Sequence, residues 1–380
     1  MADLVVPPDT QLVPTGDFSA AVRRAGLLAW DSTGVEVEAA LRGQLTLAFL
    51  GSASAGKDSA IRAVFGIDFG EISPIPGSTS TLKVIPLDEA GQVLLVNAPG
   101  FGDVRSDVDQ VGRKVMDDLD VIVYVVNAEG GATIDERRDL DAIRSGYDGK
   151  PRPVLVCLNK IDLIRVKERE AFIVATLAQL GVDRKDCVVA AFDPLPQLAS
   201  APIGVAEVTL WIHDHLALSG KQLLFAKHLR NKAQACEPII LAAAKRASLA
   251  GAIPVPGADL VVVTAIQVKL IRDIAVVHGV EVDKDVALFI IGELLSGGMR
   301  SFVRWGAEAL KAAGWIPGAQ IAEAAILAVG AMVAGATTFG VGKAAIQYFQ
   351  SDRSLDSSAL RVVFDAAAWD WKRRGEAAKG

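Results

Sequence analysis

A glycine-rich turn over residues 51–59, set between an apolar run and a helical pattern, limits the fold of this chain more than any other feature. Residues 45–50 before it are mostly apolar strand formers, and residues 58–65 after it carry apolar side chains at helical spacing. Gly51 and Gly56 let consecutive backbone N–H groups wrap a phosphate, and Lys57 can reach its oxygens. The order of strand, loop and helix therefore predicts an α/β fold with a phosphate-binding loop, rather than a plain Gly/Ser turn.

A second motif, Asn159-Lys160-Ile161-Asp162, follows the apolar run 153–158. It therefore lies at the carboxyl end of a predicted strand, where ligands bind in open α/β sheets. A carboxylate at Asp162 can accept hydrogen bonds from guanine N1–H and the 2-amino group, whereas adenine offers no such pair of donors. On its own the motif is a common surface turn, but downstream of a phosphate loop it favours GTP over ATP.

Two further segments, Pro76-Gly-Ser-Thr-Ser-Thr81 and Asn97-Ala-Pro-Gly100, lie between these motifs. With them the chain resembles the Era-like branch of the small GTPases over about residues 44–217. The resemblance implies that Thr79 supplies a hydroxyl to Mg²⁺ and that the Gly100 amide contacts the γ-phosphate. It also implies GTP or GDP and Mg²⁺ as the bound ligands.

Two positions depart from that family pattern. Asp58 stands where Ser or Thr normally contacts Mg²⁺, and Asn97 stands where the family carries Asp. Both positions flank the same ion, and hard cations prefer charged oxygen ligands, so we expect Asp58 to restore the charge that Asn97 lacks. The alternative is a degenerate site that binds nucleotide weakly or without metal, with Asp58 only capping a helix.

Hydrolysis is expected to be slow, because Phe101 follows Gly100 and an apolar side chain cannot orient the attacking water. Ser54 replaces the Asn of potassium-stimulated relatives, so rate enhancement would have to come from a partner or from self-association. Arg105 is a speculative donor of transition-state charge and more simply a solvated loop residue.

The candidate residues fall into three groups by expected role. The catalytic candidates are Lys57, Thr79 and Gly100. The metal candidates are Asp58, Thr79 and Asn97. The nucleotide-binding candidates are Gly51, Ser52, Ala53, Ser54, Ala55, Gly56, Lys57, Asp58, Ser59, Asn159, Lys160, Asp162, Ala190 and Ala191, the last two as the guanine-ring loop.

The expected fold is an α/β domain with a mostly parallel sheet and helices on both faces, followed by an all-α region. Residues 82–88 and 92–97 predict an antiparallel hairpin, and residues 121–126 a buried strand. Two N-terminal helical stretches, near 17–28 and 35–41, are expected to pack on the sheet. The predicted division is residues 1–43 as a helical extension, 44–217 as the GTPase domain, 218–351 as an Ala/Gly-rich helical domain and 352–380 as a helical tail.

The C-terminal helical segment carries Ala252-Ile-Pro-Val-Pro256-Gly257 before the apolar run 258–272. Over about residues 225–350 it resembles a helical family of unknown function found behind Era-like GTPases, some members of which are thought to associate with membranes. Residues 324–342 carry no charge and reach the lower limit of a membrane span, but Ala, Gly and Thr dominate them. A helical bundle or a reversible membrane contact is favoured over a permanent anchor.

Length, charge and cysteine content limit the number of domains, the kinds of partner and the cellular compartment. The chain has 380 residues, a formal net charge of −6 and three cysteines, so it predicts two cores, no basic footprint for nucleic acid and no disulfide framework. We expect a cytoplasmic protein that binds guanine nucleotide, with self-association and peripheral contact with the inner face of a membrane left open. The predicted function is a slow GTPase switch that controls the helical domain. The alternatives are a ribosome- or RNA-associated assembly GTPase and a non-hydrolysing nucleotide-binding scaffold.

Overall fold

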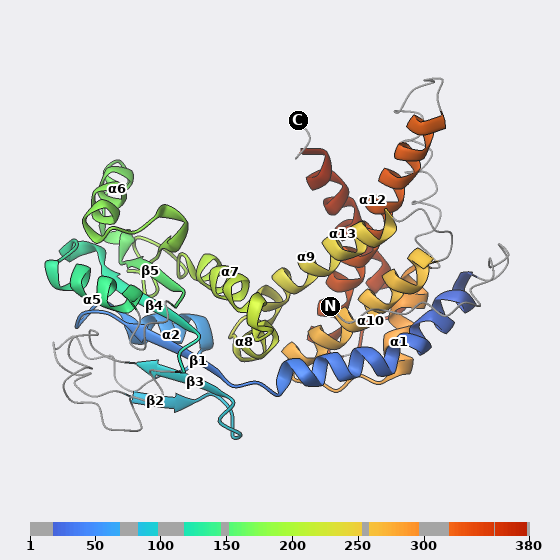
Figure 1. The fold of residues 1–380 in the computed structure, drawn as a ribbon, viewed down its shortest axis with the longest axis horizontal. Coiled ribbons are helices and arrows are strands. Elements are labelled where there is room, and N and C mark those ends of the chain that lie inside the picture. Colours follow the sequence, from blue (N-terminus) through green and yellow to red (C-terminus); the bar gives the residue numbers. More distant parts are fainter. Residues whose placement is uncertain are drawn as a thin grey trace. The chain divides into compact units, whose positions relative to one another are not determined.

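The fold is described from a computed structural model, shown in Figure 1. The structure describes residues 18–68, 83–97, 118–145, 152–252, 258–295, 319–352 and 354–377. The chain divides into two compact units, Ala40–Gln234 and a helical unit made of Met1–Ala39 with Ala235–Gly380. We refer to the first as the sheet unit and describe each unit by itself.

A six-stranded sheet with the order β2-β3-β1-β4-β5-β6 forms the centre of the sheet unit. Only the β2–β3 pair is antiparallel; β1, β3, β4, β5 and β6 run parallel to one another. The predicted hairpin and the predicted buried strand are therefore both present. The strands are β1 (Leu45–Leu50), β2 (Lys83–Pro86), β3 (Val93–Asn97), β4 (Val121–Asn127), β5 (Val154–Asn159) and β6 (Cys187–Val189).

Helices cover both faces of this sheet, which explains why its central strands are apolar on both sides. In β1, Leu50 joins a core cluster with Leu140 and Leu177 from two helices, whereas the neighbouring Phe49 contacts Phe65 on the other face. The helices of the sheet unit are α2 (Lys57–Phe65), α5 (Ile134–Ser145), α6 (Arg169–Leu180), α7 (Val205–Leu216) and α8 (Gln222–His228). Short 3₁₀ turns are η1 (Ala128–Gly130), η2 (Ile161–Leu163), η3 (Arg184–Asp186) and η4 (Ala217–Ser219).

The described part of the helical unit contains helices alone, as the sequence predicts. Its helices are α1 (Phe18–Leu41), α9 (Lys232–Gly251), α10 (Ala258–His278), a helix over residues 284–295, α12 (Ala319–Gln350) and α13 (Ser357–Ala377). The ends of α1 and α9 reach a few residues into the sheet unit. Helix α12 packs against α10 and α13.

Glycines bring the backbones of two helices together in this unit. A Cβ on Gly330 of α12 would lie 2.3 Å from the carbonyl oxygen of Gly251 in α9, and one on Gly251 would lie 2.6 Å from that of Gly330. Real side chains do not tolerate such distances, so the crossing requires glycine at both positions. The apolar residues of α12 are spread around the whole helix and do not form one stripe, a pattern typical of a buried helix.

The N-terminal prediction was wrong in two respects. One continuous helix, α1, spans the expected gap at Gly34, and it belongs to the helical unit instead of packing on the sheet. Arg272 of α10 explains both differences. Its guanidinium lies 3.4 Å from the ring centroid of Trp30 and donates a 3.0 Å hydrogen bond to the Trp30 carbonyl, and it also lies against Gly34.

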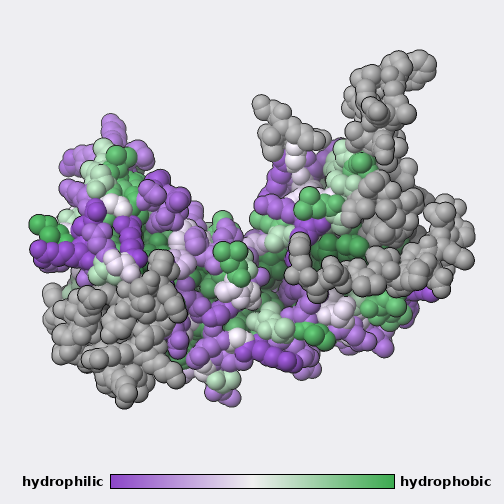
Figure 2. All heavy atoms as spheres, viewed as in Figure 1, coloured by the Kyte–Doolittle hydropathy of each residue, from purple (hydrophilic) through white to green (hydrophobic). Residues whose placement is uncertain are grey.

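A single helical stretch among the described residues, Leu327–Gln350, is long and apolar enough to cross a membrane. Its mean hydropathy is 1.3, and 67% of the apolar window is buried inside the protein. A core helix of a soluble protein passes the same test, so length and composition do not decide the question. On the face drawn in Figure 2, hydrophobic side chains appear as separate groups among hydrophilic ones, which is normal for a folded chain.

Candidate functional site

The loop after β1 has the backbone that a phosphate cradle needs. Gly51 has φ 141° and Gly56 has φ 94°. A Cβ on Gly51 would lie 2.1 Å from the Val125 carbonyl oxygen, and one on Gly56 would lie 2.2 Å from Asn159 Nδ2. Neither position therefore accepts a side chain, and the loop is held close to β4 and β5. Ser52, Ala53, Ser54 and Ala55 form the turn, in which Ser54 has a positive φ of 61°.

Lys57 is the first residue of α2 and its side chain is buried, 4% exposed. Its ammonium folds back over the loop and donates to the carbonyl oxygens of Gly51 at 2.9 Å and Ser52 at 3.0 Å. Burial lowers the pKa of Lys57 to about 8, and the neighbouring Asp58 carboxylate opposes that shift. The lysine is thus held inside the loop, where a phosphate would meet it.

Asp58 and Asn97, the two positions that depart from the family pattern, are in direct contact. Asn97 ends β3 and donates a hydrogen bond from Nδ2 to Asp58 Oδ1. Asn97 is 1% exposed, and its Oδ1 is buried without a hydrogen-bond partner among the described residues. A carboxylate and an unpaired amide oxygen beside the loop are oxygen donors of the kind that Mg²⁺ prefers, so these residues fit the ion that the family implies.

Glu136 is a buried residue of this site that the sequence reading missed. Its Oε1 accepts a 3.1 Å hydrogen bond from Ser52 Oγ of the loop, and its Oε2 accepts from the Thr133 backbone N–H at 2.9 Å. The Glu136 N–H in turn is bonded to Thr133 Oγ1 at 3.1 Å. This is a capping box at the start of α5. The Thr-x-x-Glu spacing could have located the helix start, but not the contact with Ser52.

Asn159 connects the loop to the segment expected to lie beside the guanine ring. Its Nδ2 donates to the Ala55 carbonyl at 2.8 Å, and its Oδ1 accepts from the Phe192 N–H at 3.0 Å. Ala190 and Ala191 are fully buried next to it, and the Ala190 carbonyl accepts from the Ile161 N–H at 3.1 Å. Ala190 and Ala191, the sequence candidates with the least distinct motif, therefore lie at the same edge of the sheet as the phosphate loop.

The remaining residues of the Asn-Lys-x-Asp motif shape the turn after β5. Lys160 has a positive φ of 64°, and Asp162 is 8% exposed within η2. Asp162 Oδ2 accepts a 3.2 Å hydrogen bond from the Leu195 N–H, which ties the loop after β6 to this turn. This bond uses only one of the two carboxylate oxygens of Asp162, so the other can accept from the guanine ring.

Two predicted residues, Thr79 and Gly100, lie outside the described residues, as do Phe101 and Arg105. The others come together at one edge of the sheet, around the loop between β1 and α2. Among the described residues no group of three or more His, Cys, Asp or Glu side chains could hold a metal. Of the predicted metal ligands, Asp58 and Asn97 are the two that lie in the described part of the chain.

Comparison with known proteins agrees with this geometry. Residues 46–160 match the family model described as a 50S ribosome-binding GTPase, and residues 220–367 match a domain of unknown function, DUF697. GTPase Der of Sulfurihydrogenibium sp. is 30% identical over 137 residues, which are 34% of this chain and 30% of the relative. GTPase Era of Borrelia hermsii is 26% identical over 148 residues, which are 38% of this chain and 49% of the relative.

These matches concern only part of each relative, since the chain spans between about a third and a half of their length. A solved structure of a probable GTP-binding protein, engB, is 19% identical in sequence, with a TM-score of 0.31. The match covers 46% of the present chain and 99% of the engB chain. A TM-score of that size supports no argument. The two family matches, the motifs and the sheet order together show that the chain carries a GTP-binding, Era/Der-like P-loop GTPase domain followed by a DUF697 helical domain.

Proposed function

We propose that this protein hydrolyses GTP slowly and uses its nucleotide state to control the helical unit. The observation that carries the proposal is the packing of α8, the last helix of the sheet unit. Helix α8 contacts the far end of α2, the helix that begins at Lys57, and the turn before β3, the strand that ends at Asn97. Helix α9 follows α8 after three residues. A change at the phosphate loop is therefore transmitted by packing to the segment that leads into the helical unit.

The first contact runs through α2, the helix that begins at Lys57. Phe65 at its end makes an edge contact with Phe225 of α8 at 6.0 Å between ring centroids, and a second with Phe49 of β1 at 6.1 Å. The Arg230 N–H donates to the Val64 carbonyl at 2.9 Å just beyond α8. Because packed aromatic rings transmit displacement, a shift of α2 would move α8 as well.

The second contact runs through the β2–β3 hairpin, whose strand β3 ends at Asn97. Asp88 in its turn lies 3.3 Å from His228 Nε2 at the end of α8, and both side chains are largely buried. Asp88 also accepts a 2.8 Å hydrogen bond from the Gln92 N–H, which holds the turn in shape. Helix α8 is thus in contact with both α2 and the β2–β3 hairpin, and each of these elements also reaches the nucleotide site.

The site chemistry assigns each motif a role in this proposal. Lys57 and the backbone of the loop bind the β- and γ-phosphates, while Asp162 selects guanine. Asp58 and Asn97 hold Mg²⁺ together with Thr79, and the Gly100 amide contacts the γ-phosphate. The ion, when bound, neutralises charge that develops on the phosphates. With Phe101 next to Gly100, turnover stays slow until a partner or a second copy assists.

The output proposed for the helical unit is self-association or reversible attachment to a membrane surface, with the protein in the cytoplasm. The stretch Leu327–Gln350 of α12 is compatible with this output, because a helix of this length and hydropathy can pack in a bundle or against lipid. An assembly role on the ribosome is the alternative that the matched family's description suggests. The net charge of −6 argues against it, since RNA binding needs a basic surface.

Nucleotide binding with and without Mg²⁺ tests the site. Wild type, Asp58→Ala and Asp183→Ala are compared, the last removing a carboxylate that is 79% exposed and far along the chain. We expect Mg²⁺ to strengthen GTP binding in wild type and Asp183→Ala but not in Asp58→Ala. Full Mg²⁺ dependence in Asp58→Ala would overturn the role given to this residue, and binding without turnover in every condition would favour a scaffold.

Hydrogen exchange in α9 tests the switch. With a non-hydrolysable GTP analogue in place of GDP, we expect altered exchange in residues 232–251 of wild type. Phe225→Leu should reduce that difference while nucleotide affinity stays unchanged, because it loosens the contact with Phe65 without touching the loop. Leu218→Ala, at a side chain that is 99% exposed, is the matched control. An undiminished difference in Phe225→Leu would contradict transmission through α8.

A further inference from the structure

A cavity of about 500 Å³ lies at the edge of the sheet opposite the phosphate loop. Pro153 and Val154 border it at the start of β5, and Lys185 and Asp186 border it just before β6. At the other ends of the same two strands, the nucleotide-site residue Asn159 is the last residue of β5 and Ala190 directly follows β6. The cavity is therefore separate from the site already described, and nothing in the GTPase motifs accounts for it.

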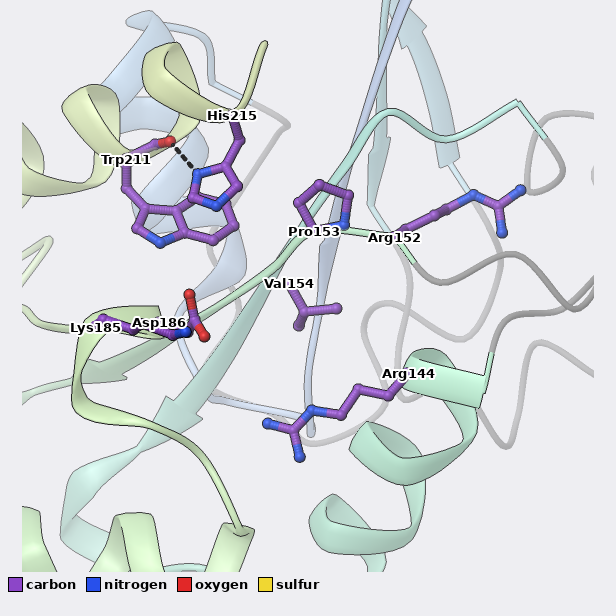
Figure 3. Close-up of a pocket in the computed structure, with 8 residues that line it drawn as sticks. All are labelled: Arg144, Arg152, Pro153, Val154, Lys185, Asp186, Trp211 and His215. Carbon is purple, nitrogen blue, oxygen red and sulfur yellow. Dashed lines mark hydrogen bonds between the residues drawn. The ribbon is translucent and has the colours of Figure 1, made fainter. Parts of the chain in front are cut away.

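An aromatic pair forms one wall of this cavity (Figure 3). Trp211 and His215 stand one turn apart on α7 and stack with ring centroids 3.6 Å apart and planes 22° apart. His215 Nδ1 lies 2.8 Å from the Trp211 carbonyl oxygen. Since a carbonyl only accepts, Nδ1 carries the hydrogen and Nε2 remains for another contact. Trp211 Nε1 is buried and has no hydrogen-bond partner in the described chain.

Charged side chains surround the rest of the cavity. Figure 3 shows Arg144 entering from α5 and the carboxylate of Asp186 turned toward the space beside Val154, while Arg152 extends away from the other side chains. Arg144 donates from one nitrogen to the Gly181 carbonyl at 2.8 Å, which fixes its guanidinium and leaves further N–H groups in the fork. Lys185 is 77% exposed and its nearest acid, Asp183, is 3.9 Å away.

We infer that this cavity binds a small phosphate ester with a flat apolar body. Two cations, Arg144 and Lys185, match a doubly charged phosphate, and a guanidinium fork suits its oxygens. Trp211 and Pro153 offer an apolar wall. The volume lies within the range of small-molecule sites, about 300–1,000 Å³. Asp186 accepts from a hydroxyl or amine on the ligand and disfavours a second anionic group beside it.

The position of the cavity gives such a ligand a route to the nucleotide site. Strand β5 has Val154 at the cavity and Asn159 at the loop, and it is paired on both sides by β4 and β6. A ligand that stiffens or shifts the start of β5 would therefore act on the two hydrogen bonds by which Asn159 holds the Ala55 carbonyl and the Phe192 N–H. Because linkage is reciprocal, nucleotide binding would then alter affinity at the cavity by the same factor.

Phenyl phosphate is the minimal probe of this site, because it joins a phosphate ester to one flat ring. Binding is measured by ligand-observed NMR on the full chain, without nucleotide and after saturation with GDP, so that the phosphate loop is filled in one arm. Inorganic phosphate tests the charge alone, benzoate tests a carboxylate in its place, and phenol tests the ring alone. Because the arm without nucleotide does not depend on GDP binding, failure of the GTPase proposal would not obscure the result.

Three variants separate this site from surface charge. We expect Arg144→Gln to weaken phenyl phosphate binding about tenfold, since a charge-assisted hydrogen bond is lost. Lys185→Gln should weaken it by about two- to fivefold, because this ammonium is exposed and screened, and its removal leaves the fold intact. Arg138→Gln is the matched control: it removes an arginine of the same helix that is 77% exposed and does not line the cavity.

The expected result is saturable binding in both arms, weakened by Arg144→Gln and Lys185→Gln and unchanged by Arg138→Gln. Absence of saturable binding would overturn the inference. Equal affinity for inorganic phosphate would do so too, since the flat body would then contribute nothing, and tighter binding of benzoate would refute the choice of a phosphate. An equal loss in Arg138→Gln would mean attraction to surface charge and would likewise refute the site.

Discussion

Replacement of Asn159 by alanine should damage the nucleotide site more than its distance from the phosphates suggests. The side chain is 3% exposed and pairs two buried backbone groups, the Ala55 carbonyl and the Phe192 N–H. Each group left unpaired costs about 1–3 kcal/mol. With partial relaxation, we expect Asn159→Ala to lower the free energy of unfolding of the sheet unit by about 3 kcal/mol.

That loss converts to a measurable temperature shift. For a unit of this size, 1 kcal/mol corresponds to about 2–4 °C in Tm, so Asn159→Ala should melt about 6–12 °C lower. Its affinity for fluorescent GDP should fall as well, because the loop loses its tie to β5. Thermal melting and nucleotide titration of the purified protein check both expectations.

Asn127 supplies the matched control, since it is the register partner of Asn159 on the neighbouring strand β4. Its side chain caps η1 by accepting one exposed hydrogen bond from the Glu129 N–H. Asn127→Ala should therefore cost about 1 kcal/mol, as the loss of a helix cap does. If Asn159→Ala melted no lower than Asn127→Ala and bound GDP equally well, the bracing role of Asn159 would be refuted.

Three other substitutions give expectations of different kinds. Gly56→Ala should abolish GDP binding in a titration, because its Cβ would lie 2.2 Å from Asn159 Nδ2 at a φ of 94°; retained affinity would show that the loop can rearrange. Burial lowers the pKa of His213, so the unfolded chain binds more protons and the stability contributed by the neutral imidazole is lost as pH falls below about 6.5. His213→Phe should therefore flatten the fall in unfolding free energy between about pH 7 and 5 in denaturant titrations, and an unchanged slope would count against this assignment. Gly330→Ala should destabilise the helical unit by about 1–3 kcal/mol in thermal melts, whereas Gly375→Ala, in open space on α13, should be neutral or stabilising; equal effects would contradict the glycine crossing.

Local patterns were enough to predict five of the six strands, all except β6, and the loops that carry the motifs. The apolar run before Gly51 and the helical spacing after it predict β1 and α2, and the hairpin and the buried β4 follow from equally local signals. These elements are predictable because their side-chain periodicity reflects burial along one element. The contact of Asn97 with Asp58 confirms that the two substituted positions are neighbours, although their joint role toward Mg²⁺ stays a prediction.

Contacts between distant elements could not be predicted in this way. Nothing near Asn159 in the sequence indicates that its amide braces Ala55, and the Thr133-x-x-Glu136 capping box does not reveal its bond to Ser52. The continuity of α1 through Gly34 depends on Arg272, which lies more than two hundred positions away. Such features are decided by tertiary packing, which overrides local propensity.

The grouping of α1 with the C-terminal helices sets an order for folding during synthesis. Trp30 and Arg272 are 242 positions apart, and the whole sheet unit lies between them in the chain. Domains fold as units as they leave the ribosome, so the sheet unit can complete its core while α1 still lacks its partners. A helix made early is thus among the last to be buried, and until then its apolar face is available to chaperones or to other nascent chains.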